Sequence, residues 1–215
     1  MTLNVLHALQ GAGFTSAIIA GGFWRDIIHG IKPRDVDVFI VDPVLSTEDT
    51  KHHLTNDSDN DLLHISTKTL SNILGIDEND VTTSAINPDN DNPQAEYHLG
   101  IRQVLTVTIN DLEFQIITTD GHTTDHIHEK FDIGLCRIYH DGDQLHMTDD
   151  FLRDAMNSTL TVFGDNMSDL QYSYTRSTHL PRFRAKYPNH RVVLNQAARK
   201  LERKYQETTP NVLPM

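Results

Sequence analysis

The spacing of apolar residues in the first part of the chain predicts short helices and strands in alternation. Leucines recur at helical intervals before two glycines, which predicts an amphipathic helix within residues 2–14. A short buried strand that ends in a glycine turn is expected over residues 16–22, a helix over 23–31, and a strand bounded by two prolines over 35–42. Strand, helix and strand within so few residues favour a mixed α/β core.

The rest of the chain contains one strong hairpin signal and several weaker patterns. Two β-prone runs, 102–110 and 112–120, meet at Asn110 and Asp111, a pair typical of tight turns. Weaker patterns predict a surface helix and loop over 45–60, a helix over 66–76 with Ser66 as its N-cap, a turn-rich loop over 87–98, a helix over 123–131, a strand over 132–142, and helices over 168–188 and 192–206.

Composition places the chain among ordinary globular proteins. Of its 215 residues 38% are hydrophobic, enough for one core, and no window approaches the roughly 18 consecutive apolar residues of a membrane span. The first residues lack the basic and apolar regions of a secretion signal. The single cysteine, Cys136, cannot form an internal disulfide and is expected as a buried thiol in a core strand. We therefore expect no membrane partner and a cytoplasmic location.

Charge is distributed unevenly along the chain. The formal net charge of -12 argues against nucleic-acid binding by the chain as a whole. From Arg176 onward, however, nine Lys and Arg residues face two Asp and Glu residues, so this segment carries +7 and the preceding residues carry -19. The cations cluster around Arg182, Arg184 and Lys186, near Tyr187 and His190. This basic segment could bind an RNA backbone with aromatic stacking, or it could be a solubilising helix.

The most informative stretch is the strand that carries Asp35 and Asp37. Residues two apart on a strand share a face, and two neighbouring carboxylates repel each other unless a cation neutralises them. Mg²⁺ and Mn²⁺ suit such oxygen ligands and commonly bind substrate phosphates as well. Upstream, Gly21 and Gly22 lie between a strand and a helix N-terminus, where backbone N–H groups can approach a phosphate. The combination indicates phosphoryl or nucleotidyl transfer, although each motif alone is more often structural.

The same stretch, "GGFWRDIIHGIKPRDVDVF", resembles the signature of polymerase-β-like nucleotidyltransferases, in particular the head domain of CCA-adding enzymes and bacterial poly(A) polymerases. The matching residues are Gly21, Gly22, Arg25, Asp26, Gly30, Asp35 and Asp37. Asp132 in "FDIGLCRIYHDG" resembles the aspartate of a later family element, and the resemblance covers roughly residues 16–142. Small nucleotidyltransferase-like proteins of bacteriophages are similarly compact, which indicates a phage origin.

The resemblance implies a fold, a cofactor and a set of site residues. The fold would be a mixed β-sheet flanked by helices over residues 1–150, with residues 151–215 as a helical basic segment packed on it. Asp35 and Asp37 would be catalytic and would bind Mg²⁺ or Mn²⁺, whereas Gly21, Gly22, Arg25 and Asp26 would bind the nucleotide. Arg25 could instead form an internal ion pair with Asp26 or Asp132. The reaction would transfer NMP from an NTP to an acceptor hydroxyl, with RNA such as a tRNA end as the acceptor.

The sequence departs from the family at the third carboxylate. The aligned position carries Gln115, which has no charge, and Glu113 shares its strand face two residues earlier. Three alternatives follow: an active enzyme with two carboxylates, a metal ligand shifted to Glu113, or a binding protein without turnover. The base-selecting element of CCA-adding enzymes is absent and the chain is too short for their neck, body and tail. Modification of a protein or small molecule on the same fold is a further alternative.

Overall fold

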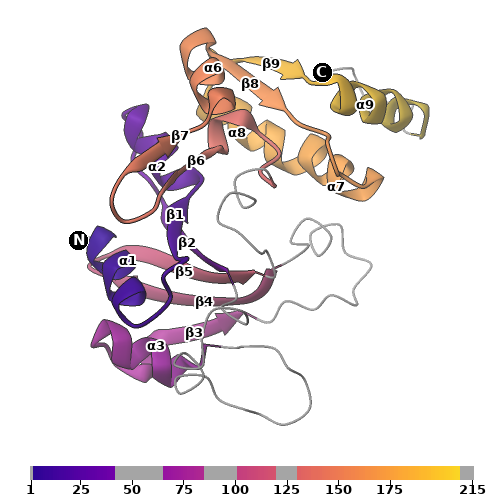
Figure 1. The fold of residues 1–215 in the computed structure, drawn as a ribbon. Helices are drawn as coiled ribbons and strands as arrows, with labels where there is room; N and C mark the ends of the chain where they lie inside the picture. The colour runs from indigo at the N-terminus through magenta and orange to yellow at the C-terminus, as the bar shows by residue number, and fades with distance from the viewer. Residues whose placement is uncertain (1, 42–64, 85–100, 120–129, 209–215) are drawn as a thin grey trace. The chain divides into compact units, whose positions relative to one another are not determined.

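The computed structural model describes residues 2–41, 65–84, 101–119 and 130–208 (Figure 1). The described residues form two compact units. The first comprises 2–41, 65–84, 101–119 and 138–146, and the second comprises 130–137 and 147–208. The division expected at residue 150, with the last segment packed on the first domain, stays a prediction.

The first unit is built on a seven-stranded mixed sheet. The strands lie in the order β3-β4-β5-β2-β1-β6-β7. β2 and β5 are parallel, whereas β1 is antiparallel to both β2 and β6, and β4 is antiparallel to both β3 and β5. The bounds are β1 Ile18–Ala20, β2 Asp35–Val41, β3 Val81–Ser84, β4 Ile101–Ile109, β5 Leu112–Thr119, β6 Ile138–His140 and β7 Leu145–Met147. The expected mixed α/β sheet with flanking helices is confirmed.

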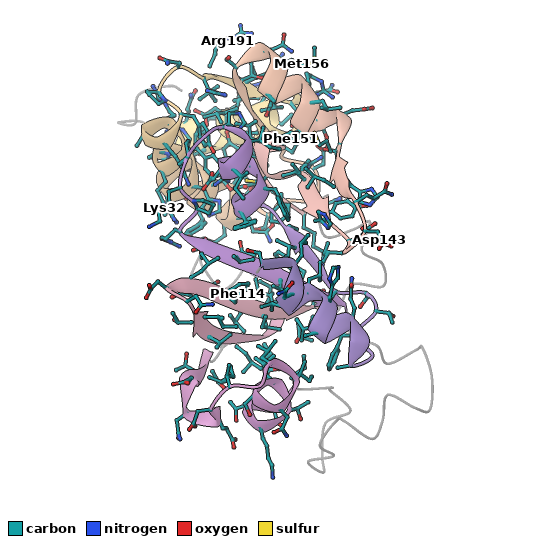
Figure 2. The ribbon with its side chains drawn as sticks, turned by 90° about the vertical axis from the view of Figure 1, so that its left-hand side faces the viewer. Lys32, Phe114, Asp143, Phe151, Met156 and Arg191 are labelled. Atoms are coloured by element: carbon teal, nitrogen blue, oxygen red, sulfur yellow. The ribbon has the colours of Figure 1, made fainter. Side chains whose placement is uncertain are left out.

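One face of this sheet packs against helices to form the core. The helices are α1 Thr2–Gly11, α2 Gly22–Ile28 and α3 Thr67–Leu74, with a 3₁₀ turn at Glu78–Asp80. Val36, Val38 and Ile40 of β2 are fully buried and cluster with Phe114 of β5, which is labelled in Figure 2, and with leucines of α1 and α3. Because these β2 residues alternate with Asp35 and Asp37, the carboxylates belong to the opposite face of the sheet.

Two local predictions are confirmed by backbone geometry. Asn110 and Asp111, between β4 and β5, have φ values of 50° and 63°, the left-handed pair of a type I′ hairpin turn. At α3, the Ser66 hydroxyl accepts a hydrogen bond of 3.0 Å from the Thr69 N–H, so Ser66 is the N-cap.

The second unit contains strands that the sequence reading missed. Its helices are α6 Asp149–Asn157, α7 Asp169–Tyr174, α8 Leu180–Lys186 and α9 Gln196–Thr208, with a π-helix at Thr175–His179. β8 (Thr159–Val162) and β9 (Arg191–Leu194) form a parallel pair. The expectation of helix throughout this region was therefore wrong at residues 159–162 and 191–194. Both strands are short and rich in β-branched residues, whose preference for a sheet depends on finding a partner.

The strand expected over 132–142 is also wrong in part. Gly134–Cys136 form a 3₁₀ turn, and β6 begins only at Ile138. A Cβ at Gly134 would lie 2.5 Å from an Asp154 carboxylate oxygen, so this glycine allows α6 to approach closely. Cys136 is buried as expected, but in this turn and not in a strand.

Some predictions lie outside the described residues: the helix and loop at 45–60, the loop at 87–98, and nearly all of the helix at 123–131. None of the helices that the structure describes is long and apolar enough to cross a membrane.

Candidate functional site

The predicted carboxylates come together on one face of the sheet through the parallel pairing of β2 with β5. In this register Asp35 lies opposite Glu113, and Asp37 lies opposite Gln115. Paired residues of neighbouring parallel strands point to the same side of the sheet. Three acidic side chains and one amide therefore share a face, although Glu113 lies almost eighty residues after the Asp pair.

Asp35 already carries a cationic partner, which the sequence reading did not single out. Arg34 donates from Nε at 2.8 Å and from Nη2 at 2.6 Å to the same carboxylate oxygen, Oδ2 of Asp35. This hydrogen bonding and the charge of Asp35, with weaker contributions from Glu113 and Asp37, raise the pKa of Arg34 above its ordinary value. The adjacency of Arg34 and Asp35 in the sequence was the signal available for it.

Asp37 is held in conditions that disfavour its charged form. Part of the residue is exposed, but burial of its carboxyl and the charge of Asp35 raise the pKa of Asp37 to about 7. Arg25 and Arg34 act in the opposite direction, and Glu113 adds a further, smaller increase. The protein thus holds two carboxylates close together with incomplete neutralisation, a feature more typical of functional sites than of structural ones.

Glu113 and Gln115 form a pair of their own on β5. The Gln115 Nε2 donates a hydrogen bond of 3.0 Å to Glu113 Oε1. The position opposite Asp37 is therefore occupied by an amide that orients the neighbouring carboxylate. Glu113 supplies the third negative charge of this face, in register with Asp35.

The glycine turn lies at the start of α2, between β1 and β2. Gly21 has φ 77° and ψ −123°, a conformation that favours glycine, and its N–H donates to the Ile138 carbonyl at 2.9 Å. Gly22 is the first residue of α2, and a Cβ there would lie 3.3 Å from Nη2 of Arg25. The two glycines therefore allow a sharp turn and leave room for the guanidinium.

Arg25 and Asp26 form a buried ion pair. Nε and Nη2 of Arg25 both lie 2.8 Å from Asp26 Oδ1, and the side chains are 8% and 3% exposed. Of the two roles left open by the sequence, the internal ion pair with Asp26 is present in the structure. Arg25 also contributes positive charge near Asp37, since it lowers the pKa of that carboxyl.

Asp132, the aspartate of the later element, lies in the second unit and is buried there. Its Oδ2 accepts a hydrogen bond from the Thr175 hydroxyl at 2.7 Å and lies 3.0 Å from Nδ1 of His179. Asp132 therefore connects residues 130–137 to the π-helix. Sequence reasoning missed this arrangement because its partners lie more than forty residues away.

The basic patch expected in the second unit is only partly suited to stacking. Arg182 and Arg184 of α8 are exposed, whereas Tyr187 is only 3% exposed. Tyr187 packs between Phe183 and His190, with ring centroids 6.3 and 5.2 Å away. The cations are thus available to a ligand, but the Tyr187 ring belongs to the packing of the unit.

The donor set on β2 fits a divalent cation of the Mg²⁺ or Mn²⁺ type. Asp35 and Asp37 share a face, and one of them already holds a guanidinium as a cationic stand-in. Among the described residues no group of three or more His, Cys, Asp or Glu side chains is arranged to hold a metal ion. Such a cation would therefore take further ligands from water and from substrate phosphates.

The fold of this chain is similar to that of CCA-adding enzymes of known structure. Similar solved structures include the Bacillus stearothermophilus CCA-adding enzyme in complex with CTP (TM-score 0.54, 11% identity, 99% of this chain and 44% of that chain). The Thermotoga maritima CCA-adding enzyme complexed with tRNA gives a TM-score of 0.52 at 16% identity, over 95% of this chain and 42% of that chain. A tRNA-processing enzyme in an apo form gives a TM-score of 0.51 at 16% identity, over 89% of this chain and 45% of that chain. At these identities the likeness shows the fold alone, and this chain spans less than half the length of these enzymes.

The family is shown by sequence. Residues 3–158 match the model of the family described as Gabija anti-defense 2 family protein, Gad2, so the chain belongs to the Gad2 family. No curated protein sequence matches this chain.

Proposed function

We propose that this chain is a metal-dependent nucleotidyltransferase that moves NMP from an NTP to an acceptor hydroxyl. The observation that carries the proposal is the register of β2 with β5, which gathers Asp35, Asp37 and Glu113 on one face of a sheet of this fold. In the transfer, the acceptor oxygen bonds to the α-phosphorus and the bond to the oxygen that bridges to the β-phosphate breaks. Pyrophosphate leaves, and the hydroxyl proton passes to solvent.

Different residues of the site would bind the cation and the triphosphate. Asp35 and Asp37 would hold Mg²⁺ or Mn²⁺, with Glu113 oriented beside them by Gln115. When bound, the cation supplies positive charge that offsets repulsion between carboxylates and triphosphate and stabilises charge on the leaving group. The turn at Gly21 and the first backbone N–H groups of α2, from Gly22 onward, would line the phosphates.

Arg25 and Asp26 would support nucleotide binding indirectly. Their ion pair is buried, and it fixes the first turn of α2 behind the carboxylates. A direct contact of Arg25 with phosphate or sugar stays part of the proposal.

RNA is the proposed acceptor, bound through the basic segment of the second unit. Two CCA-adding enzymes of similar fold have been solved in complex with tRNA and with CTP, and the exposed Arg182 and Arg184 of α8 offer charge for a phosphate backbone. The family description further supports a role against the Gabija defence, and we also propose an origin in a bacteriophage.

The direct test is to incubate the protein with each labelled NTP, in Mg²⁺ or Mn²⁺, together with total cellular RNA or protein. Labelling of RNA that depends on a divalent cation is the expected result. Labelling of protein would favour the same-fold enzyme that modifies a protein.

The first prediction concerns the two aspartates. Asp35→Ala and Asp37→Ala should each abolish transfer, by about 10³-fold or more, because each removes a charge from the proposed metal site. Circular dichroism should show both variants folded, since neither residue belongs to the apolar core. Asp143→Ala, an exposed carboxylate in the turn before β7, is the matched control and should transfer normally. Unchanged transfer by both site variants would contradict a metal-dependent mechanism at these aspartates.

A catalytically silent nucleotide-binding or host-factor-binding protein is the second candidate, and Gln115 is the observation that favours it. The β5 residue paired with Asp37 carries an amide, so no charged side chain of β5 lies directly opposite that carboxylate. Thermal stabilisation by NTP with Mg²⁺ or Mn²⁺, but no transfer to any acceptor, would support this candidate over the enzyme.

A further inference from the structure

The contact between Arg34 and Asp35 occupies one of the two carboxylate oxygens that a metal could take as a ligand. Both donors of the guanidinium fork point at Oδ2 of Asp35, at 2.8 and 2.6 Å. An sp² carboxylate oxygen has two lone pairs, and two N–H donors use both of them. A cation that takes Oδ2 as a ligand must therefore displace at least one of these hydrogen bonds.

Breaking this contact requires little free energy. The Arg34 side chain is 74% exposed, whereas that of Asp35 is 19% exposed. An ion pair with so exposed a cation contributes little to stability, because water replaces the lost hydrogen bonds. The guanidinium can therefore turn into solvent while Asp35 stays in β2.

The position of Arg34 keeps it beside the site after release. It directly precedes β2, on the short segment between α2 and β2, so its Cα remains next to that of Asp35. A guanidinium fork matches the oxygens of a phosphate in a two-point hydrogen bond. A triphosphate bound to a metal at Asp35 would bring suitable acceptors within its reach.

We propose that Arg34 is a resident counter-ion that holds Asp35 until a divalent cation binds, and is then released to bind the triphosphate. This inference rests on the proposed function, because it requires a metal at Asp35. It makes Arg34 a nucleotide-binding residue that couples the arrival of the metal to the binding of the nucleotide.

The test measures Mn²⁺ binding to the full chain by titration calorimetry without nucleotide. Arg34→Ala should bind Mn²⁺ roughly two- to fivefold more tightly than the wild type, since the competing cation is gone. Lys32→Ala is the matched control: Lys32 is exposed on the same segment and is labelled in Figure 2, and the described structure records no hydrogen bond or ion pair between it and the carboxylates. The control should bind as the wild type does. Equal or weaker binding by Arg34→Ala, or equal tightening by Lys32→Ala, would overturn the inference.

A second titration examines the nucleotide. With saturating Mn²⁺, Arg34→Ala should bind a non-hydrolysable NTP analogue about tenfold more weakly, because a charge-assisted contact is lost. Arg34→Lys keeps the positive charge but not the two-point geometry of the guanidinium, so its affinity for the analogue should lie between those of the wild type and Arg34→Ala. Unchanged affinity in Arg34→Ala would overturn the phosphate role.

Asp35→Asn separates this inference from the proposed function. If Asp35→Asn binds Mn²⁺ as the wild type does, or if the wild type binds none, the proposed metal site fails and the inference fails with it. If Asp35→Asn loses Mn²⁺ binding while Arg34→Ala leaves it unchanged, only the role of Arg34 is overturned.

Discussion

At the scale of single residues, the environment of Asp37 disfavours the ionised form of its carboxyl. Its carboxyl is buried beside Asp35, and together these raise its pKa to about 7. A carboxyl with a raised pKa in the folded state destabilises the fold when it is ionised. Raised pKa values of this kind are more frequent at functional sites than elsewhere, which agrees with the proposed metal site.

The second prediction follows from the sign of this shift. Because the pKa of Asp37 is raised on folding, its contribution to stability is complete below about pH 4, falls between about pH 4 and 7, and stays reduced above. Asp37→Asn cannot ionise, so without metal at pH 8 it should increase the free energy of unfolding by about 1–2 kcal/mol, a value reduced for solvent screening. The gain should vanish near pH 4.

Denaturant titration at several pH values measures this difference. Asp143→Asn, which neutralises an exposed carboxylate labelled in Figure 2, is the control and should show no such gain. If the free energy of unfolding depends on pH in the same way for Asp37→Asn and the wild type, the pKa of Asp37 is not raised by folding.

At the scale of elements, one buried carboxylate joins α6 to β8 in the second unit. Asp154 is fully buried and accepts three hydrogen bonds: from the Thr159 hydroxyl at 2.6 Å, the Thr161 hydroxyl at 2.5 Å and the Thr161 N–H at 2.8 Å. Gly134 leaves the space in which this carboxylate lies. The connection therefore depends on three segments of the chain.

The third prediction tests this connection. Asp154→Ala should lower the free energy of unfolding by about 3 kcal/mol or more, because buried donors lose their acceptor. Asp149→Ala, an exposed carboxylate in the first turn of the same helix, should cost less than about 1 kcal/mol. Thermal denaturation measures the stability of both variants. Equal losses of stability would show that the hydrogen bonds of Asp154 to β8 add nothing beyond the effect of a carboxylate on the helix.

At the scale of the whole molecule, charge separates the chain into an acidic part and a basic one. The residues before Arg176 carry a formal charge of -19, and those from Arg176 onward carry +7. An RNA ligand would be repelled by the first and attracted by the second, so its binding should be strongly dependent on salt.

The fourth prediction concerns this salt dependence. Arg182→Ala should weaken RNA binding and reduce the slope of log affinity against log salt by about 0.7–0.9, the contribution of one phosphate contact. Lys68→Ala removes the same charge from α3 of the first unit and should leave the slope unchanged. Fluorescence anisotropy with a labelled RNA at several salt concentrations provides both slopes, and identical slopes for the two variants would exclude Arg182 as a phosphate contact.

Local sequence determined a large part of this fold. The hairpin at Asn110 and Asp111 was predictable because two adjacent residues that tolerate left-handed backbone specify the turn by themselves. The cap at Ser66 was predictable for the same reason, since its hydrogen bond closes within three residues. The shared face of Asp35 and Asp37 follows directly from the two-residue period of a strand.

Only the tertiary structure decided which distant residues meet. The register of β2 with β5 places Glu113 opposite Asp35, and a shift by one residue would have turned Glu113 to the other face of the sheet. The pairing of β8 with β9 and the 3₁₀ turn at Gly134–Cys136 depend likewise on partners far along the chain. Periodicity specifies which face a side chain occupies, but pairing between distant segments is set by the packing of the whole unit, and no local pattern contains it.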